Sequence, residues 1–125
     1  MKILLCEDNE ISARIATLVL TRFNHEVDLA VDGHEALDKF VLNTYDIILM
    51  DGMMPSMCGL ETTKKIREIE EKEARETRVK ILAFSADSSD ENIVKCIQSG
   101  MDSFVEKPLR PASDDFIKTF VHNQN

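Results

Sequence analysis

The chain has 125 residues, 43% of them hydrophobic and 30% charged, which is typical of a folded globular domain and excludes a disordered or membrane-embedded chain. Its 23 acidic residues outnumber its 15 lysines and arginines, and the formal net charge of −8 disfavours binding to nucleic acid or to an anionic membrane surface. No apolar run approaches the roughly 20 residues that span a bilayer, so we expect a cytoplasmic protein.

Five short apolar segments have the length of β-strands. The predicted strands are KILLC at 2–6, VDLAV at 27–31, DIILM at 46–50, KILAF at 80–84 and DSFV at 102–105.

Apolar residues that recur every three or four positions predict a helix after each strand. Asn9 is expected to precede the first helix, Ser88 or Ser89 to open the fourth, and Gly100 to follow its end. The residues that carry the helical spacing are Ile11, Ile15, Leu18 and Val19 in the first helix, Ala36, Leu37, Phe40 and Val41 in the second, Ile66 and Ile69 in the third, Ile93, Val94 and Ile97 in the fourth, and Phe116, Ile117, Phe120 and Val121 in the fifth.

The alternation of strand and helix predicts a parallel sheet with right-handed crossovers, because a helix connects each strand to the next. The segments at 2–6, 46–50 and 80–84 are almost continuously apolar, as strands covered on both faces are. The segment at 27–31 alternates more and could lie at an edge. We therefore predict an α/β fold of three layers, a five-stranded parallel sheet flanked by five helices, with residues 1–125 forming one domain.

Polar side chains that suit phosphate chemistry follow four of the predicted strands. They are Glu7 and Asp8 after the first strand, Asp51 after the third, Ser85 after the fourth, and Lys107 shortly after the fifth. The carboxyl ends of parallel strands share one edge of a sheet, where such folds bind their ligands, so these side chains are expected to converge.

Carboxylates, a hydroxyl and an ammonium together suit a divalent cation and a phosphoryl group. Mg²⁺ prefers oxygen ligands, commonly one or two carboxylates together with water and phosphate oxygens. A lysine ammonium pairs with phosphate as a compact charge, and a serine hydroxyl can donate to another phosphoryl oxygen. With metal and lysine present, Asp51 would stay ionised and could act as a nucleophile, which predicts an aspartyl phosphate.

Four stretches of the sequence, in chain order, resemble the receiver domain of two-component response regulators. They are ILLCEDNE at 3–10, IILMDGMMPSMCGLE at 47–61, ILAFSA at 81–86 and FVEKPL at 104–109. The segment CEDNEISARIA at 6–16 further resembles the receivers attached to hybrid histidine kinases and to multistep phosphorelays. The resemblance covers essentially the whole chain and implies a flavodoxin-like topology with strand order 2-1-3-4-5.

By position, the resemblance implies that Asp51 accepts a phosphoryl group in a Mg²⁺-dependent reaction. Glu7 and Asp8 would hold the Mg²⁺ together with Asp51, and the backbone carbonyl of Met53 would complete the protein ligands. Mn²⁺ is expected to be able to replace Mg²⁺. The domain would not be an enzyme toward other molecules, because it would catalyse only its own phosphorylation and dephosphorylation.

The resemblance also implies a switch and a set of partners. Ser85 and Lys107 would contact the phosphoryl oxygens, and Phe104 would rotate inward as Ser85 shifts, which makes Ser85 and Phe104 the switch residues. The bond between Lys107 and Pro108 corresponds to one that is commonly cis. The expected phosphodonor is a histidine kinase or a histidine phosphotransfer protein, and the responding partner is a downstream effector or a kinase domain of the same protein. Neither nucleic acid nor a membrane is an expected partner.

Two other functions fit parts of the same pattern. A phosphohydrolase of the haloacid dehalogenase type also uses an Asp nucleophile at a strand end, but it is expected to carry a second Asp two residues later, where this chain has Met53. A receiver-like binding module that is never phosphorylated is the other alternative, and the complete set of acids, serine and lysine disfavours it.

Overall fold

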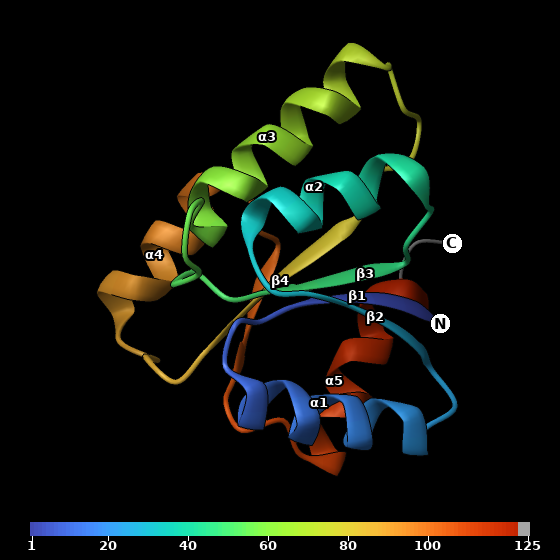
Figure 1. Ribbon diagram of the computed structural model, residues 1–125, viewed down its shortest axis with the longest axis vertical. Helices are drawn as coiled ribbons and strands as arrows, with labels where there is room; N and C mark the ends of the chain where they lie inside the picture. The colour runs from blue at the N-terminus through green and yellow to red at the C-terminus, as the bar shows by residue number, and fades with distance from the viewer. Residues whose placement is uncertain (123–125) are drawn as a thin grey trace.

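Five strands and five helices alternate along the chain in the computed structural model, which describes residues 1–122 (Figure 1). Residues 123–125 of the predicted domain, and the side chain of Val121, lie outside the described part of the chain. Within residues 1–122, no helix is both long enough and apolar enough to cross a membrane. The strands are β1 (Lys2–Cys6), β2 (Glu26–Ala30), β3 (Ile47–Met50), β4 (Lys80–Ser85) and β5 (Ser103–Glu106). The helices are α1 (Glu10–Arg22), α2 (Gly33–Leu42), α3 (Gly59–Lys72), α4 (Asp90–Ser99) and α5 (Pro111–His122).

The five strands form one parallel sheet in the order β2-β1-β3-β4-β5, which confirms the predicted fold class and strand order. β1 and β3 are neighbours inside the sheet, with Cys6 opposite Met50, and β2 lies at an edge, as its alternating pattern suggested. Because all strands run in the same direction, the residues that end or follow β1, β3, β4 and β5 meet at one edge of the sheet.

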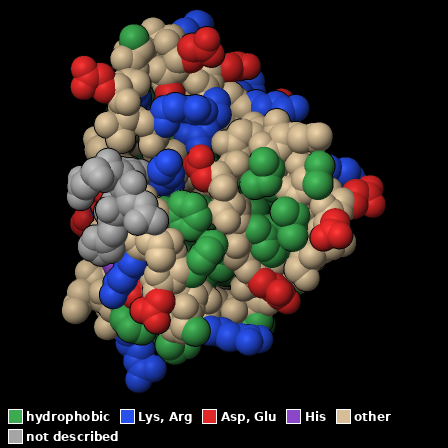
Figure 2. Space-filling model, turned by 180° about the vertical axis from the view of Figure 1, so that it is seen from behind, with side chains coloured by type: hydrophobic (Ala, Val, Ile, Leu, Met, Phe, Trp, Pro, Cys, Tyr) green, Lys and Arg blue, Asp and Glu red, His purple; other side chains and the backbone are tan. Residues whose placement is uncertain are grey.

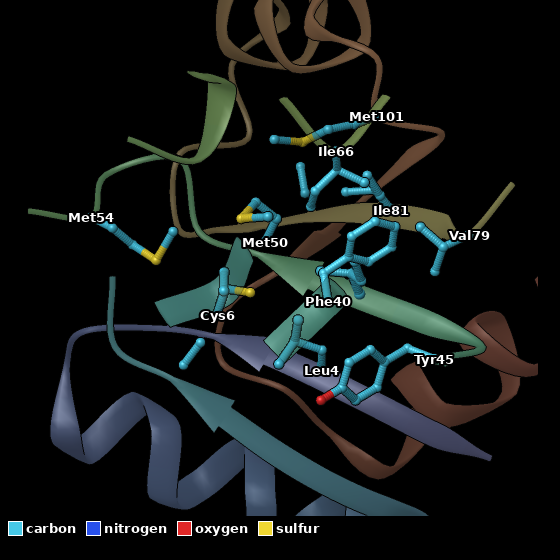
Figure 3. Close-up of a cluster of buried hydrophobic side chains, with 14 of the residues drawn as sticks. Leu4, Cys6, Phe40, Tyr45, Met50, Met54, Ile66, Val79, Ile81 and Met101 are labelled. Atoms are coloured by element: carbon cyan, nitrogen blue, oxygen red, sulfur yellow. The ribbon is translucent and has the colours of Figure 1, made fainter. Parts of the chain in front are cut away.

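Helices cover both faces of the sheet and bury a separate core on each. Figure 1 shows α2, α3 and α4 on one face and α1 and α5 on the other. Successive side chains of a strand point to opposite faces, so Leu4 and Cys6 pack with Phe40 of α2 in one core (Figure 3), while Ile3 and Leu5 enter the core beneath α1 and α5. Burial of each large apolar side chain contributes roughly 1.5–3 kcal/mol to the stability of the fold. The two cores together fix the strands whose carboxyl ends bear the polar residues.

Most element limits lie within a residue of those predicted. Asn9 caps α1 and Gly100 ends α4, and Ser89 rather than Ser88 caps α4. Ser85 and Glu106 are the last residues of β4 and β5 instead of following them.

The helices form where their spacing predicted them, but several of the residues that carried the spacing point outward. Ile11 and Leu18 are 72% and 67% exposed, and Val41, Val94 and Ile97 are also exposed. α1 instead buries Ala13, Ala16 and Leu20, and α4 buries Cys96 and Ser99. The small residues allow close packing against the sheet.

Arg67 of α3 connects α3 to neighbouring segments through the hydrogen bonds of its partly buried guanidinium. Its guanidinium donates to the carbonyl of Gly100 (3.0 Å) and to that of Val79 (2.8 Å). It also pairs with the carboxylates of Glu70 (2.7 Å) and Asp102 (2.8 Å). Arg67 therefore ties α3 to the start of β4 and to the connection between α4 and β5.

A buried polar contact attaches α5 to the connection between α1 and β2. His25 Nε2 lies 2.6 Å from Asp114 Oδ1, and both residues are buried. The other oxygen of Asp114 lies 3.0 Å from the Lys118 ammonium. The sequence pattern did not predict this pair, because neither residue follows a predicted strand end or belongs to a recognised motif.

Candidate metal and phosphoryl site

The carboxylates of Glu7, Asp8 and Asp51 converge at the carboxyl edge of the sheet. One oxygen from each lies within 4.8 Å of the others. Hydrogen bonds that continue the sheet fix their backbones, since the Asp51 amide donates to the Cys6 carbonyl (3.0 Å) and the Glu7 amide to the Ala30 carbonyl (2.9 Å). Glu7 is fully buried, Asp51 is 5% exposed and Asp8 is exposed, so the cluster is accessible from the side of Asp8.

Lys107 supplies the positive charge at this cluster. Its Nζ contacts Glu7 Oε2 and lies 3.3 Å from Asp51 Oδ2. Its backbone N–H donates to the Ser85 carbonyl (2.9 Å), so the hydrogen bonding between β4 and β5 extends one residue further, to Lys107. The bond from Lys107 to Pro108 is cis, as the resemblance implied. The ammonium pairs with two of the three carboxylates of the cluster, which is therefore short of positive charge.

Glu7 is held in an environment that opposes its ionisation. Burial raises the pKa of the Glu7 carboxyl, although contacts with Lys107 and with the Asn9 amide act in the opposite direction. Oε1 accepts a hydrogen bond from the Asn9 N–H (2.9 Å), whereas Oε2 meets the lysine as an ion pair without hydrogen-bond geometry. A buried carboxylate oxygen without a hydrogen bond is costly, and an additional cation would offset that cost.

The donor set fits a hard divalent cation. All three side chains offer oxygen, the ligand that Mg²⁺ and Mn²⁺ prefer, and Glu7 also has one buried oxygen, Oε2, without a hydrogen bond. Met53, two residues after Asp51, is 83% exposed, and its backbone N–H donates to Asp51 Oδ1 (3.0 Å). This contact orients the Asp51 carboxylate.

The two predicted switch residues occupy different surroundings. Ser85 ends β4, and its hydroxyl accepts a hydrogen bond from the Asp87 N–H (3.0 Å). Phe104, on the neighbouring strand opposite Ala83, is half-buried and packs against the core beneath α2, α3 and α4. Phe104 and Phe116 both line an open pocket of about 400 Å³ on the outer side of β5 and α5. Ser85 therefore adjoins the cluster through the Lys107 backbone, whereas Phe104 is set apart from it.

Two contributors to the site were not predicted. Asn9 was expected only as a helix cap, a role that it fills by accepting from the Ser12 N–H (2.9 Å), yet its own amide also holds Glu7. The ring centroid of Phe84 lies 5.1 Å from Lys107 Nζ, close enough for a cation–π contact. In the sequence Phe84 is one apolar residue of a strand, and nothing distinguishes it from the rest of the core.

Comparisons with known proteins show the family to which the chain is similar. A family model described as response regulator receiver domain matches residues 3–117. Hybrid signal transduction histidine kinase L of Dictyostelium discoideum is 37% identical over 128 residues, which cover 99% of this chain and 7% of that protein. The chain thus spans a small part of the length of such relatives.

Solved structures resemble the whole chain. The receiver domain of Ssk1 from Saccharomyces cerevisiae, crystallised with the histidine phosphotransfer protein Ypd1, has a TM-score of 0.92 and 27% identity, covering 99% of this chain and 90% of that one. The receiver domain of sensor histidine kinase PA1611 from Pseudomonas aeruginosa, crystallised with a magnesium ion in its active-site cleft, has a TM-score of 0.84 and 31% identity, covering 97% of both chains.

Proposed function

The chain belongs to the response regulator receiver family of two-component signalling, and we propose that residues 1–125 act as one receiver domain in which Asp51 accepts a phosphoryl group. The observation that carries this proposal is the convergence of Asp51 with Glu7, Asp8 and Lys107, which follow three different strands. It is a signalling module, and the only reactions that we propose for it are its own phosphorylation and dephosphorylation.

In the proposed reaction a carboxylate oxygen of Asp51 attacks the phosphorus atom of a phosphohistidine. A P–O bond to Asp51 forms as the P–N bond breaks, and the donor imidazole keeps the electron pair of the broken bond. The Met53 N–H holds Asp51 Oδ1 in a fixed orientation, which favours in-line attack. Lys107, 3.3 Å from Asp51 Oδ2, can remain paired with the negative charge as it passes to the phosphoryl oxygens.

Glu7, Asp8, Asp51 and the backbone carbonyl of Met53 are the groups that we propose to hold Mg²⁺, with Mn²⁺ as a substitute. When bound, the ion would supply positive charge that neutralises the carboxylates and the transferring phosphoryl oxygens. The cluster of three acids around one lysine supports this assignment, because the residues alone leave negative charge in excess.

The proposed switch begins at Ser85. To donate to a phosphoryl oxygen, the Ser85 hydroxyl would turn away from the Asp87 amide that it now faces. The loop after β4 would then lose one of its contacts, and Phe104 could move inward against β4. A new charge at the site would in this way change the surface that partners bind.

We propose a histidine kinase or a histidine phosphotransfer protein as the phosphodonor, and a downstream effector or a kinase domain of the same polypeptide as the responding partner. The similarity to receivers of hybrid kinases and to one crystallised with Ypd1 supports both. We further propose that the domain acts in the cytoplasm without contacting nucleic acid or membrane, in keeping with its net charge of −8.

The phosphohydrolase alternative has no support at the site, because the position two residues after Asp51 is the exposed Met53 and not a second acid. Release of phosphate from ordinary phosphomonoesters over many turnovers would revive it.

The direct test is treatment with acetyl phosphate and Mg²⁺ followed by mass spectrometry of the intact protein. Wild type should gain ~80 Da, the mass of one phosphoryl group, and Asp51→Asn should gain nothing. Asp38→Asn, which removes an exposed carboxylate of α2, is the matched control and should react like wild type. An unmodified wild type, under conditions that label another receiver domain, would refute the proposal.

A further inference from the structure

The loop between β3 and α3 makes two close contacts, and in each of them the contacting residue of a helix is a glycine, Gly59 of α3 or Gly33 of α2. A Cβ atom built on Gly59 would lie 2.8 Å from the carbonyl carbon of Asp51, and the Gly59 N–H donates to the Gly52 carbonyl (3.1 Å). A Cβ built on Gly33, the first residue of α2, would lie 2.7 Å from both the carbonyl oxygen and the Cβ of Met57. Close contacts with α3 and with α2 therefore restrict the position of the loop that contains Met53.

The contact at Gly33 involves backbone and not only a flexible side chain. The Met57 carbonyl belongs to a tight segment, since the Met57 N–H donates to the Pro55 carbonyl (2.7 Å) and Ser56 has a φ of 67°. Thr62 Oγ1, the atom closest to a Cβ on Gly33, donates to the carbonyl of Cys58 at the end of the same loop (2.9 Å). Any side chain at position 33 would have to displace this segment as a unit.

We propose that Gly33 is a positioning residue for the metal and phosphoryl site. By carrying no side chain, it lets Met57 rest against α2, and this places the loop so that Met53 meets Asp51. The inference rests on the proposed function, because the group being positioned is the Mg²⁺ and phosphoryl site. Gly33 touches neither group and acts only through the loop.

The matched pair for the test is Gly33→Ala and Gly52→Ala. Gly52 adjoins Asp51, but a Cβ there would have no atom within 4 Å, so its replacement should leave Mg²⁺ binding unchanged. Gly33→Ala should weaken Mg²⁺ binding by about tenfold, the lower end of the effect of losing a residue that orients metal ligands. The dissociation constant is measured by NMR titration of each variant with Mg²⁺, and folding is checked by thermal unfolding in EDTA.

A second pair of variants separates the loop from the packing of α2 on α3. Thr62→Ala in the Gly33→Ala background removes the contact with the Thr62 hydroxyl but leaves those with Met57. The double variant should regain part of the stability measured in EDTA, while its Mg²⁺ affinity stays close to that of Gly33→Ala. Full recovery of Mg²⁺ affinity would overturn the proposal, because the effect would then come from helix packing alone.

A titration of the wild type needs no substitution at position 33. As Mg²⁺ is added, the amide resonance of Gly33 should shift with the same dissociation constant as that of Gly59, while Gly100 should not respond. A Gly33 resonance that stays fixed, or Gly33→Ala binding Mg²⁺ as tightly as wild type, would overturn this inference and leave the proposed function intact. A wild type that binds no Mg²⁺ would overturn both.

Discussion

Glu7 is the residue at which burial and charge conflict in the candidate site. Burial raises the pKa of its carboxyl above the ordinary value of 4.5. The native state therefore retains a proton that the unfolded chain releases, so the stability due to this group is fully present below pH 4.5 and is lost as the pH rises through the raised pKa. In EDTA, we expect wild type to lose stability relative to Glu7→Gln as the pH rises.

Urea unfolding of both proteins between about pH 4 and pH 8 measures this difference. Glu10→Gln, at an exposed position three residues away, is the control and should follow wild type. Parallel stability curves for wild type and Glu7→Gln would contradict the expected conflict at Glu7.

Individual residues of the site could be predicted where their type alone indicates their chemistry. Asp51 and Lys107 are costly after apolar runs unless something pairs with them, and they are indeed paired. Asn9 and Phe84 could not be predicted, because one acts through a backbone N–H that every residue but proline has, and the other through the face of a ring that also fits an ordinary core.

Among the elements, α3 depends on Arg67 for its attachment to β4 and to the end of α4. Arg67→Ala would leave the Glu70 carboxylate, which is 2% exposed, without its closest cation, and removing one partner of a buried pair typically costs about 3 kcal/mol. Chemical unfolding should show this loss. Arg78→Ala removes the more distant Arg78, 3.7 Å from Glu70 and 63% exposed, and should change stability by less than about 0.5 kcal/mol. Equal effects would mean that Arg67 is not the attachment.

The contact between His25 and Asp114 should determine how firmly α5 is held. Replacing either residue by Ala removes the hydrogen bond between two buried side chains, so each variant should lose about 2 kcal/mol and the double variant less than the sum. A double-mutant cycle by urea unfolding gives the coupling energy. Lys118→Ala, at a side chain that is 42% exposed, should have a small effect. Additive losses would show that the two side chains do not stabilise each other.

Helices were harder to predict in detail than strands for a physical reason. A strand inside this sheet is buried on both faces, so a run such as IILM at 47–50 has one interpretation. A surface helix can bury small residues and expose large ones, as α1 does when it buries Ala13 and Ala16 and exposes Ile11 and Leu18. Apolar spacing therefore located α1 correctly but did not identify its buried face.

The net charge of the whole molecule is −8, and three of its carboxylates gather at the candidate metal site. If Mg²⁺ binds there, the stability of the whole domain should depend on the Mg²⁺ concentration. An ion that binds only the native state at 100 times its dissociation constant adds about 2.7 kcal/mol, or about 10 °C in melting temperature for a domain of this size. Thermal unfolding with and without Mg²⁺ should show the rise for wild type and for Asp38→Ala. Asp8→Ala should abolish it, and an undiminished rise in that variant would remove Asp8 from the site.

The order of the strands has a consequence for how the site forms while the chain is being synthesised. Lys107 reaches the acids only after β5 has taken its place beside β4 at the far end of the sheet. A nascent polypeptide on the ribosome exposes Glu7, Asp8 and Asp51 well before its counter-charge has been translated. Under the proposed function, the site is complete only once synthesis has passed position 107, so we expect a nascent chain that ends before Lys107 to be a poorer phosphoacceptor than the finished one.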